Sequence, residues 1–291
     1  MIKNLGEIMR TKTEMLELFK KQTKEDNRIR LSVLEGSLTN VNIPKDKYQD
    51  YDVTFFVTER DSFLVSDSWL AIFGKVVFMQ KPEDMTLFPP EFPKMYSYLM
   101  YLEDGIKIDL SLVLVKDLPW YLEESDGLVE VLVDKDRLLS NLAPASDKNY
   151  WLKEPNQAEF NDCLNEFWYV SAYVAKGLAR GELLFAMDHL HNNIRQELLR
   201  MMSWHIGYEQ GYDRSLGKNY KFIQNYLSEE NWQDFLLTFD LSTKEKMEHS
   251  FWHTLSLFQT YSKQVSVELG FDYPNDDEVM ISFIETFYLK R

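Results

Sequence analysis

Short apolar runs with the composition of β-strands dominate the first half of the chain. Residues rich in β-branched and aromatic side chains occur at 29–34, 53–57, 76–79, 98–102, 106–115 and 128–133. Runs of this length and composition predict strands. The pair Asp104-Gly105 separates the fourth run from the fifth, and Asp-Gly between alternating apolar residues is typical of a hairpin turn.

A different period, that of an amphipathic helix, characterises the second half. Apolar residues recur at helical spacing in 157–180, 182–208, 245–269 and 276–288, and also near the start in 7–26, while 63–73 is compatible with a helix. The stretch 142–148 is polar and contains a proline, as linkers do. The pattern predicts an α/β (α+β) fold class, with a mixed β-sheet and flanking helices in 1–145 and a helical bundle in 146–291.

Composition limits the class of protein and the cellular compartment in which we expect it. The chain has 291 residues, 45% of them hydrophobic, with one cysteine and a net charge of -15. This length and apolar content fit two globular domains. The first residues lack the apolar core of a secretory signal, and one cysteine forms no internal disulfide, so we expect a cytoplasmic protein. No uncharged apolar run has the length that a membrane span needs, so we expect no membrane association.

The negative charge also bears on partners. It repels nucleic-acid backbones and attracts cations, so we expect no nucleic-acid substrate and favour a cationic small molecule. The alternative is that the charge serves solubility alone.

Three carboxylates carry the candidate chemistry. Asp50 and Asp52 lie two residues apart where the chain enters a predicted strand, and Asp109 lies within the later run 106–115. On extended backbone the first two side chains point to the same face. An unpaired carboxylate within an apolar strand is costly to bury, so Asp109 needs a cation or a hydrogen-bonding partner. Together the three predict a Mg²⁺ site, because Mg²⁺ binds a few carboxylates together with substrate phosphates.

A glycine-serine turn precedes these carboxylates. Gly36 allows close approach of the backbone, so the following amides and the Ser37 hydroxyl could hold a phosphate. Asp109 is then our candidate for the general base that deprotonates an acceptor hydroxyl. The Asp-x-Asp pattern alone is weak, since Asp134-Lys135-Asp136 has the same form. The alternative is that the three carboxylates belong to turns and a strand edge and never meet.

The whole arrangement resembles the nucleotidyltransferase superfamily that includes DNA polymerase beta, whose pattern is Gly-Ser, Asp-hydrophobic-Asp and a distant third carboxylate. Further motifs are similar to those of bacterial aminoglycoside 6-adenylyltransferases over nearly the whole chain. These are Asn40, Gln49-Asp50-Tyr51-Asp52, Phe73-Gly74, Pro82-Glu83, Ile108-Asp109-Leu110, Asp134-Lys135-Asp136, Pro144-Ala145-Ser146-Asp147-Lys148, Asn165-Glu166-Phe167-Trp168, Ala175-Lys176-Gly177-Leu178 and Gly217-Lys218-Asn219.

The resemblance implies an activity and a layout. It implies ATP as the donor of AMP, the 6-hydroxyl of streptomycin as the acceptor, and a catalytic domain followed by a helical domain that closes the cleft. One departure is Glu35, an acidic residue where the family has a neutral one before Gly36. This departure puts details of the phosphate turn in doubt and leaves the carboxylates unaffected.

The helical half supplies the remaining candidates. Glu182, Asp188 and Trp204 are predicted to contact a guanidinium-bearing substrate, and Lys218 and Lys221 to neutralise nucleotide phosphates. Each has an ordinary structural alternative on a helix or in a solvated loop. Glu182 or Asp188 could also replace Asp109 as the base.

Other functions remain open at this point. They are transfer to another aminoglycoside, to a lincosamide or to a protein hydroxyl, and a catalytically silent nucleotidyltransferase fold that only binds a nucleotide or a partner.

Overall fold

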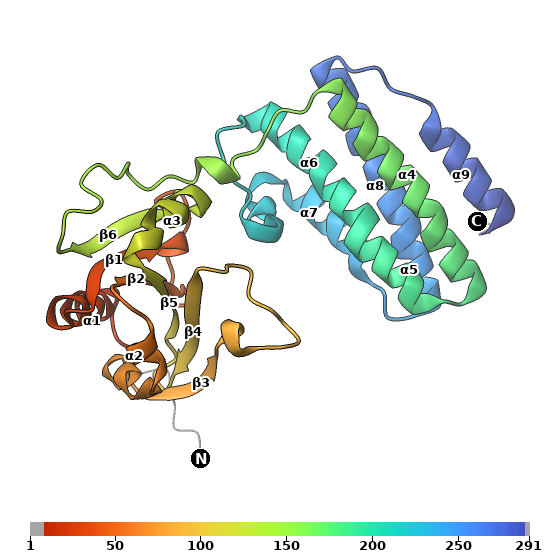
Figure 1. Cartoon of the computed structure of the whole chain (residues 1–291). Coiled ribbons are helices and arrows are strands. Elements are labelled where there is room, and N and C mark those ends of the chain that lie inside the picture. The colour runs from red at the N-terminus through yellow and green to blue at the C-terminus, as the bar shows by residue number, and fades with distance from the viewer. Residues whose placement is uncertain (1–8, 289–291) are drawn as a thin grey trace. The chain divides into compact units, whose positions relative to one another are not determined.

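The computed structural model describes residues 9–288, and its chain divides into two compact units, Met1–Asn149 and Tyr150–Arg291. The first unit contains a six-stranded mixed sheet and the second is helical (Figure 1). The predicted fold class is thereby confirmed. None of the helices in residues 9–288 combines the length and the apolar character that crossing a bilayer requires.

The sheet contains all six predicted strands, in the spatial order β3-β4-β5-β2-β1-β6. Only β2 and β5 run parallel, and the other neighbours are antiparallel. The predicted hairpin is confirmed, because β4 pairs with β5 across a turn in which Gly105 has a φ of 85°. The strands are β1 (Ile29–Glu35), β2 (Tyr51–Val57), β3 (Val76–Gln80), β4 (Met95–Leu102), β5 (Lys107–Leu114) and β6 (Val129–Asp134).

Each face of the sheet is covered by short helical elements. Successive side chains of a strand point to opposite faces, so Phe55 packs in one core and Phe56 in the other. The Phe55 core includes residues of α1 (Lys12–Glu25), α2 (Asp61–Leu64) and the 3₁₀ segment Asp67–Phe73. The Phe56 core includes residues of α3 (Leu118–Glu124), a helix that the sequence pattern did not predict.

Helix α1 begins later than its apolar pattern. The pattern spans 7–26, but Thr11 caps the helix in a reciprocal pair with Glu14, and the helical residues begin at Lys12. Such a capping box satisfies amide groups that would otherwise lack partners at the helix start. The predicted residues 7 and 8 lie outside the described part of the chain.

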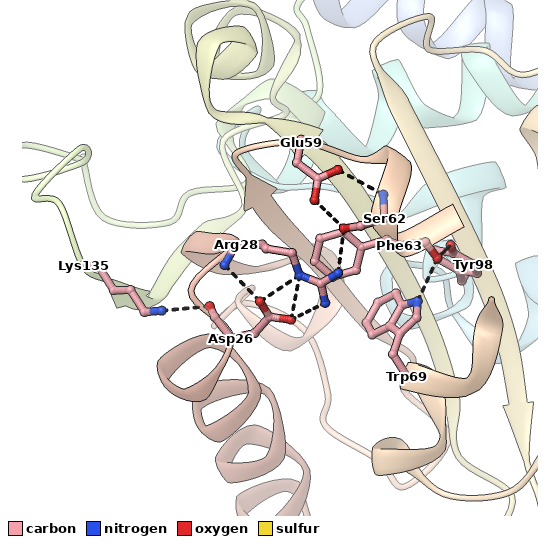
Figure 2. A network of polar contacts seen from close by, with 8 residues as sticks. All are labelled: Asp26, Arg28, Glu59, Ser62, Phe63, Trp69, Tyr98 and Lys135. Carbon is pink, nitrogen blue, oxygen red and sulfur yellow. Dashed lines mark hydrogen bonds and ion pairs between the residues drawn. The ribbon is translucent and has the colours of Figure 1, made fainter. Parts of the chain in front are cut away.

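A polar network joins the end of α1 to the loop after β2 (Figure 2). The guanidinium of Arg28 donates to both carboxylate oxygens of Asp26, donates to Ser62 Oγ at 2.7 Å and lies 3.8 Å from the centroid of the Phe63 ring. The hydrogen bonds from Arg28 lower the pKa of Asp26. Lys135 donates to the Asp26 carbonyl, so one residue connects three segments around the sheet.

The second unit is built on long helices. Helices α4, α6 and α8 pack against one another, and α5 and α9 pack on α4 (Figure 1). Their side chains form one continuous core. The helices are α4 (Gln157–Arg180), α5 (Leu183–His189), α6 (Arg195–Gln210), α7 (Glu229–Leu236), α8 (Lys244–Leu269) and α9 (Asp276–Phe287).

Local signals explain the ends of α4 well. Asn156 and Glu159 form a capping box at its start, and Gly181, with a φ of 72°, ends it in the left-handed conformation. The predicted helix over 182–208 is one helical run with a π-helical turn at Leu190–Ile194 between α5 and α6. Helix α7 was not predicted.

Candidate active site

The parallel pairing of β2 with β5 brings two of the three predicted carboxylates together. Asp52 and Asp109 are direct register partners in this pair, so their side chains leave the sheet side by side. Asp50 lies immediately before β2. Asp52 and Asp109 lie on strands that are far apart in the chain and become neighbours only through a crossover connection, which the local sequence does not specify.

Lys107 lies between the carboxylates of Asp50 and Asp109 and pairs with both. Its ammonium donates to Asp50 Oδ2 at 2.7 Å and to Asp109 Oδ2 at 2.9 Å. Burial disfavours the charged form of Lys107, but its hydrogen bonds to Asp50 and Asp109 and the charges of these carboxylates outweigh burial and raise the pKa of Lys107. Lys107 was not among the predicted site residues, although Lys107 and Asp109 are two apart on one strand and therefore share a face.

Asp52 lies in an unfavourable place for a negative charge. Burial, followed by the charges of Asp109, Glu35 and Asp50, raises the pKa of Asp52 to about 7, against the opposing effect of Lys107. Asp109 Oδ1 is buried and has no hydrogen-bond partner among the described residues. The site therefore holds more negative charge than its single lysine neutralises.

Position 36 requires a glycine, because the backbone there lies very close to the Asp52 carboxylate. Its φ is +65°, and a Cβ atom at this position would lie 2.6 Å from Asp52 Oδ2. Two non-bonded heavy atoms cannot come so near, so any other residue would displace the carboxylate. The glycine-serine turn and the carboxylates thus form one local structure.

Two side chains that follow the Gly36-Ser37 turn in the sequence hydrogen-bond to it. Gln49 donates to the carbonyl oxygen of Ser37 at 3.1 Å and to its hydroxyl at 3.2 Å. Lys45 donates to the carbonyl oxygens of Ser37, Leu38 and Asn40. Apart from the bond to the Ser37 hydroxyl, these contacts use carbonyl oxygens of the turn, so they fix its shape without using its backbone amides.

The segment predicted as a linker also contacts this region. Asp147, only 3% exposed, accepts hydrogen bonds from Asn40 Nδ2 at 3.3 Å and Asn42 Nδ2 at 2.9 Å. The predicted boundary was at residue 145, and these bonds explain why the compact first unit extends to Asn149.

The departure at Glu35 has a structural counterpart. The Glu35 carboxylate accepts hydrogen bonds from Thr54 at 2.9 Å and from the hydroxyl of Tyr121 on α3. Burial raises the pKa of Glu35 although both hydrogen bonds lower it. The Glu35 side chain thus points into the interior of the first unit, where its hydrogen bonds connect β1 with β2 and α3.

A basic cavity adjoins the carboxylates. It has a volume of about 700 Å³, includes Asp50 and Lys107 in its wall, and is also lined by Arg10, Lys12, Lys45 and Lys47. Tyrosine rings complete part of the lining. In a chain with a net charge of -15, this local excess of cations is suited to an anionic ligand.

The candidates from the helical half do not form one group. Glu182 precedes α5 and pairs with Arg180 at 2.6 Å, while Asp188 accepts a hydrogen bond from Asn192. Trp204 lies on α6, farther along the same helical run. At 1.5 Å per residue it is roughly 24 Å from Asp188 and farther from Glu182, so the three do not surround one small molecule. Lys218 and Lys221 are exposed and flank a left-handed Asn219.

Comparisons with known proteins identify the family of the chain. The family model described as streptomycin adenylyltransferase matches residues 9–287. The chain belongs to this family. Aminoglycoside 6-adenylyltransferases from Bacillus subtilis and Staphylococcus aureus are 48% and 49% identical to it, each match covering 96% of this chain and 99% of the relative.

A crystal structure of the Bacillus subtilis aminoglycoside 6-adenyltransferase has 43% identity and a TM-score of 0.48, with 96% of this chain and 98% of that chain covered. As a member of the streptomycin adenylyltransferase family, the protein is a nucleotidyltransferase, an enzyme that transfers AMP.

The candidate site has features that suit a divalent cation. Its ligands would be Asp50, Asp52 and Asp109, and the unpartnered Asp109 Oδ1 and the raised pKa of Asp52 both mark a deficit of positive charge. Within residues 9–288 no three His, Cys, Asp or Glu side chains are grouped closely enough to hold a metal ion. The ammonium of Lys107 lies between two of the three carboxylates instead.

Proposed function

We propose that this protein transfers AMP from ATP to the 6-hydroxyl of streptomycin in a Mg²⁺-dependent reaction that confers antibiotic resistance. The observation that supports the proposal most directly is the convergence of Asp50, Asp52 and Asp109 beside a basic cavity. The proposed acceptor class and position follow the names of the relatives, which are aminoglycoside 6-adenylyltransferases, and streptomycin follows the description of the family.

The carboxylates divide the chemical work. We propose that Asp50, Asp52 and Asp109 hold Mg²⁺, which supplies stabilisation of the charge on the transferring phosphoryl group. Asp109 takes the proton of the acceptor hydroxyl. The hydroxyl oxygen then forms a bond to the α-phosphorus of ATP, the bond to the bridging oxygen breaks, and pyrophosphate leaves. A carboxylate of the helical unit, such as Glu182 or Asp188, is the alternative base.

The nucleotide needs groups that hold its phosphates. The Ser37 hydroxyl and the backbone amides that follow Gly36 are the proposed phosphate contacts in the first unit, since the Gly36 amide itself donates to the carbonyl oxygen of Leu128, and the basic cavity offers further cations. Lys218 and Lys221 are the proposed phosphate contacts in the helical unit.

For the cationic substrate, Trp204 is the best supported of the three candidates. It is 8% exposed and lines a cavity of about 410 Å³ together with Glu159, Asp162, Glu166 and Glu197. An indole with several carboxylates suits guanidinium groups, through cation–π contact and charge-assisted hydrogen bonds. Glu197 is already paired with Arg200, and Glu159 accepts from the amide of Asn156 in the capping box of α4, which leaves Asp162 and Glu166, one helical turn apart, as the proposed contacts.

Release of pyrophosphate tests the proposal. The protein is incubated with ATP, Mg²⁺ and, in separate reactions, streptomycin, other aminoglycosides and a lincosamide. We expect turnover with streptomycin, at least 100-fold loss in Asp109→Asn, and an unchanged circular dichroism spectrum. Asp136→Asn is the matched control, because Asp136 belongs to the surface Asp-x-Asp and pairs with Arg30.

Three outcomes would contradict parts of the proposal. Equal turnover in Asp109→Asn would exclude Asp109 as the base. Turnover only with another acceptor would reassign the substrate. Binding of ATP without turnover of any acceptor would identify a catalytically silent fold.

A further inference from the structure

A second cavity, within the helical unit, has the opposite charge character to the protein as a whole. It has a volume of about 590 Å³ and lies between the start of α6, the 3₁₀ segments at Lys218–Tyr220 and Ile223–Tyr226, and α7. Its lining includes Arg195, Lys221, His191 and the rings of Trp232, Phe235 and Phe239, and no aspartate or glutamate of the described chain contributes to that lining.

Arg195 is the central feature of this cavity. It is 1% exposed, its Nη1 is 2.8 Å from Nδ1 of His191, its Nη2 donates to the carbonyl oxygen of Thr238, and its guanidinium carbon lies 4.1 Å from the centroid of the Phe239 ring. Its Nε has no hydrogen-bond partner among the described residues. Burial lowers the pKa of Arg195 to about 10, and no described carboxylate pairs with it.

Such an arrangement is costly in the free protein. A buried charge is normally paired, because desolvation costs several kcal/mol per ion. The same unit obeys this rule elsewhere. Asp277 is 2% exposed, and its carboxylate accepts hydrogen bonds from Gln259 and Tyr273 and pairs with Lys263. Arg195 therefore lacks the counter-ion that the other buried charge of the unit possesses.

We propose that this cavity binds a phosphate group, with Arg195 and Lys221 as its cationic contacts. A guanidinium with a free N–H is the side chain that best matches phosphate oxygens, and an exposed lysine adds a second charge. The aromatic side chains opposite would accommodate a planar group that carries the phosphate. The inference rests on the proposed function in one respect, because Lys221 is also a proposed contact of the nucleotide phosphates; it involves none of the carboxylates of the first unit, so phosphate binding and pyrophosphate release test the two separately.

Isothermal titration calorimetry on the full chain tests this site with two probes, inorganic phosphate and AMP, in buffer without divalent cations. We expect both to bind, and Arg195→Met to weaken both by roughly tenfold or more, as loss of a charged hydrogen bond would. Arg195→Lys should recover part of the affinity. Lys221→Met should weaken binding several-fold, and because Lys221 is exposed this variant keeps its fold.

Arg200→Gln is the control. Arg200 lies on the same helix as Arg195 but pairs with Glu197 and does not line this cavity. The Arg200→Gln variant should therefore bind both probes with the affinity of the wild type. Tighter binding of AMP than of phosphate would show that the planar group occupies the aromatic wall, and equal binding would show that phosphate alone is recognised. The proposal fails if neither probe binds, or if Arg195→Met and Lys221→Met both bind as the wild type does.

Discussion

Single residues determine the charge balance of the candidate active site. Lys107 neutralises part of the repulsion between Asp50 and Asp109, yet Asp109 Oδ1 keeps no partner and the pKa of Asp52 stays near 7. The ammonium of Lys107 occupies carboxylate oxygens that the proposed divalent cation would use. The same lysine would then compete with a divalent cation for the carboxylate oxygens.

Competition of this kind predicts the effect of Lys107→Met. Loss of the ammonium should strengthen binding of Mn²⁺, used as a spectroscopic probe for Mg²⁺, by roughly tenfold, because one repelling charge is gone. Electron paramagnetic resonance of free Mn²⁺ measures the affinity. Lys75→Met is the control, since Lys75 pairs with Glu103. Unchanged or weaker Mn²⁺ binding in Lys107→Met would contradict the competition.

Gly36 provides a second test at the residue scale. Gly36→Ala combines an unfavourable positive φ with a Cβ atom 2.6 Å from Asp52 Oδ2. We expect a loss of about 1–3 kcal/mol in the free energy of unfolding and loss of pyrophosphate release. Gly181→Ala separates the two effects, because Gly181 has a φ of +72° with no atom within 4 Å of the added Cβ. It should lose stability and keep its activity; equal activity in both variants would contradict the steric explanation.

At the scale of elements, the site depends on which strands are neighbours. The parallel pair β2 and β5 places Asp52 opposite Asp109, and the antiparallel pair β1 and β2 places Glu35 opposite Asp52. Helix α3 then supplies Tyr121 to Glu35. The acidic residue before the glycine turn is thus a contact between elements of the first unit.

This contact makes stability depend on pH. Burial raises the pKa of Glu35 above its ordinary value of 4.5. A carboxyl whose pKa is raised by folding contributes stability below its unfolded pKa and loses it as the pH rises through the folded pKa. We therefore expect Glu35→Gln to gain stability relative to the wild type as the pH rises from about 4 to about 9. Urea unfolding across this range measures the difference.

Glu103→Gln is the reference for this series, because Glu103 is an exposed surface partner of Lys75. Its difference from the wild type should vary little with pH. A difference for Glu35→Gln that is equally constant would mean that folding leaves the pKa of Glu35 unchanged.

At the scale of the whole molecule, charge is distributed unevenly. The chain carries a net charge of -15, but one cavity in each unit has a wall enriched in basic side chains, and the cavity at Trp204 is rich in carboxylates. A cationic antibiotic is attracted by the overall field, whereas anionic ligands need local basic walls to overcome it.

The overall field predicts a salt effect on substrate binding. Because salt screens exposed charges, the KM for streptomycin should rise several-fold between about 0.05 M and about 0.5 M ionic strength, while kcat changes little. The KM for ATP should not rise in parallel, since the overall field repels it. Steady-state kinetics at a series of salt concentrations measures both, and a KM for streptomycin that is independent of salt would contradict electrostatic attraction.

Features that depend on neighbours in the chain were determined by the sequence itself. All six strands were predicted, as was α4 with its exact limits, because apolar period, capping residues and turn glycines act over a few residues. The Asp104-Gly105 hairpin belongs to the same class. The motifs of the candidate site were also recognisable, because their residue types and spacing resemble those of a known superfamily.

Other features were decided only by tertiary structure. The short helices α3 and α7 carry too little periodic sequence to be recognised alone, and packing determines them. Lys107 between two aspartates, Asp147 against Asn40, and the unpaired Arg195 all depend on contacts between distant segments. Strand pairing and burial determine which charges come together and which lack a partner, and neither can be deduced from local sequence, because both depend on how the whole chain packs.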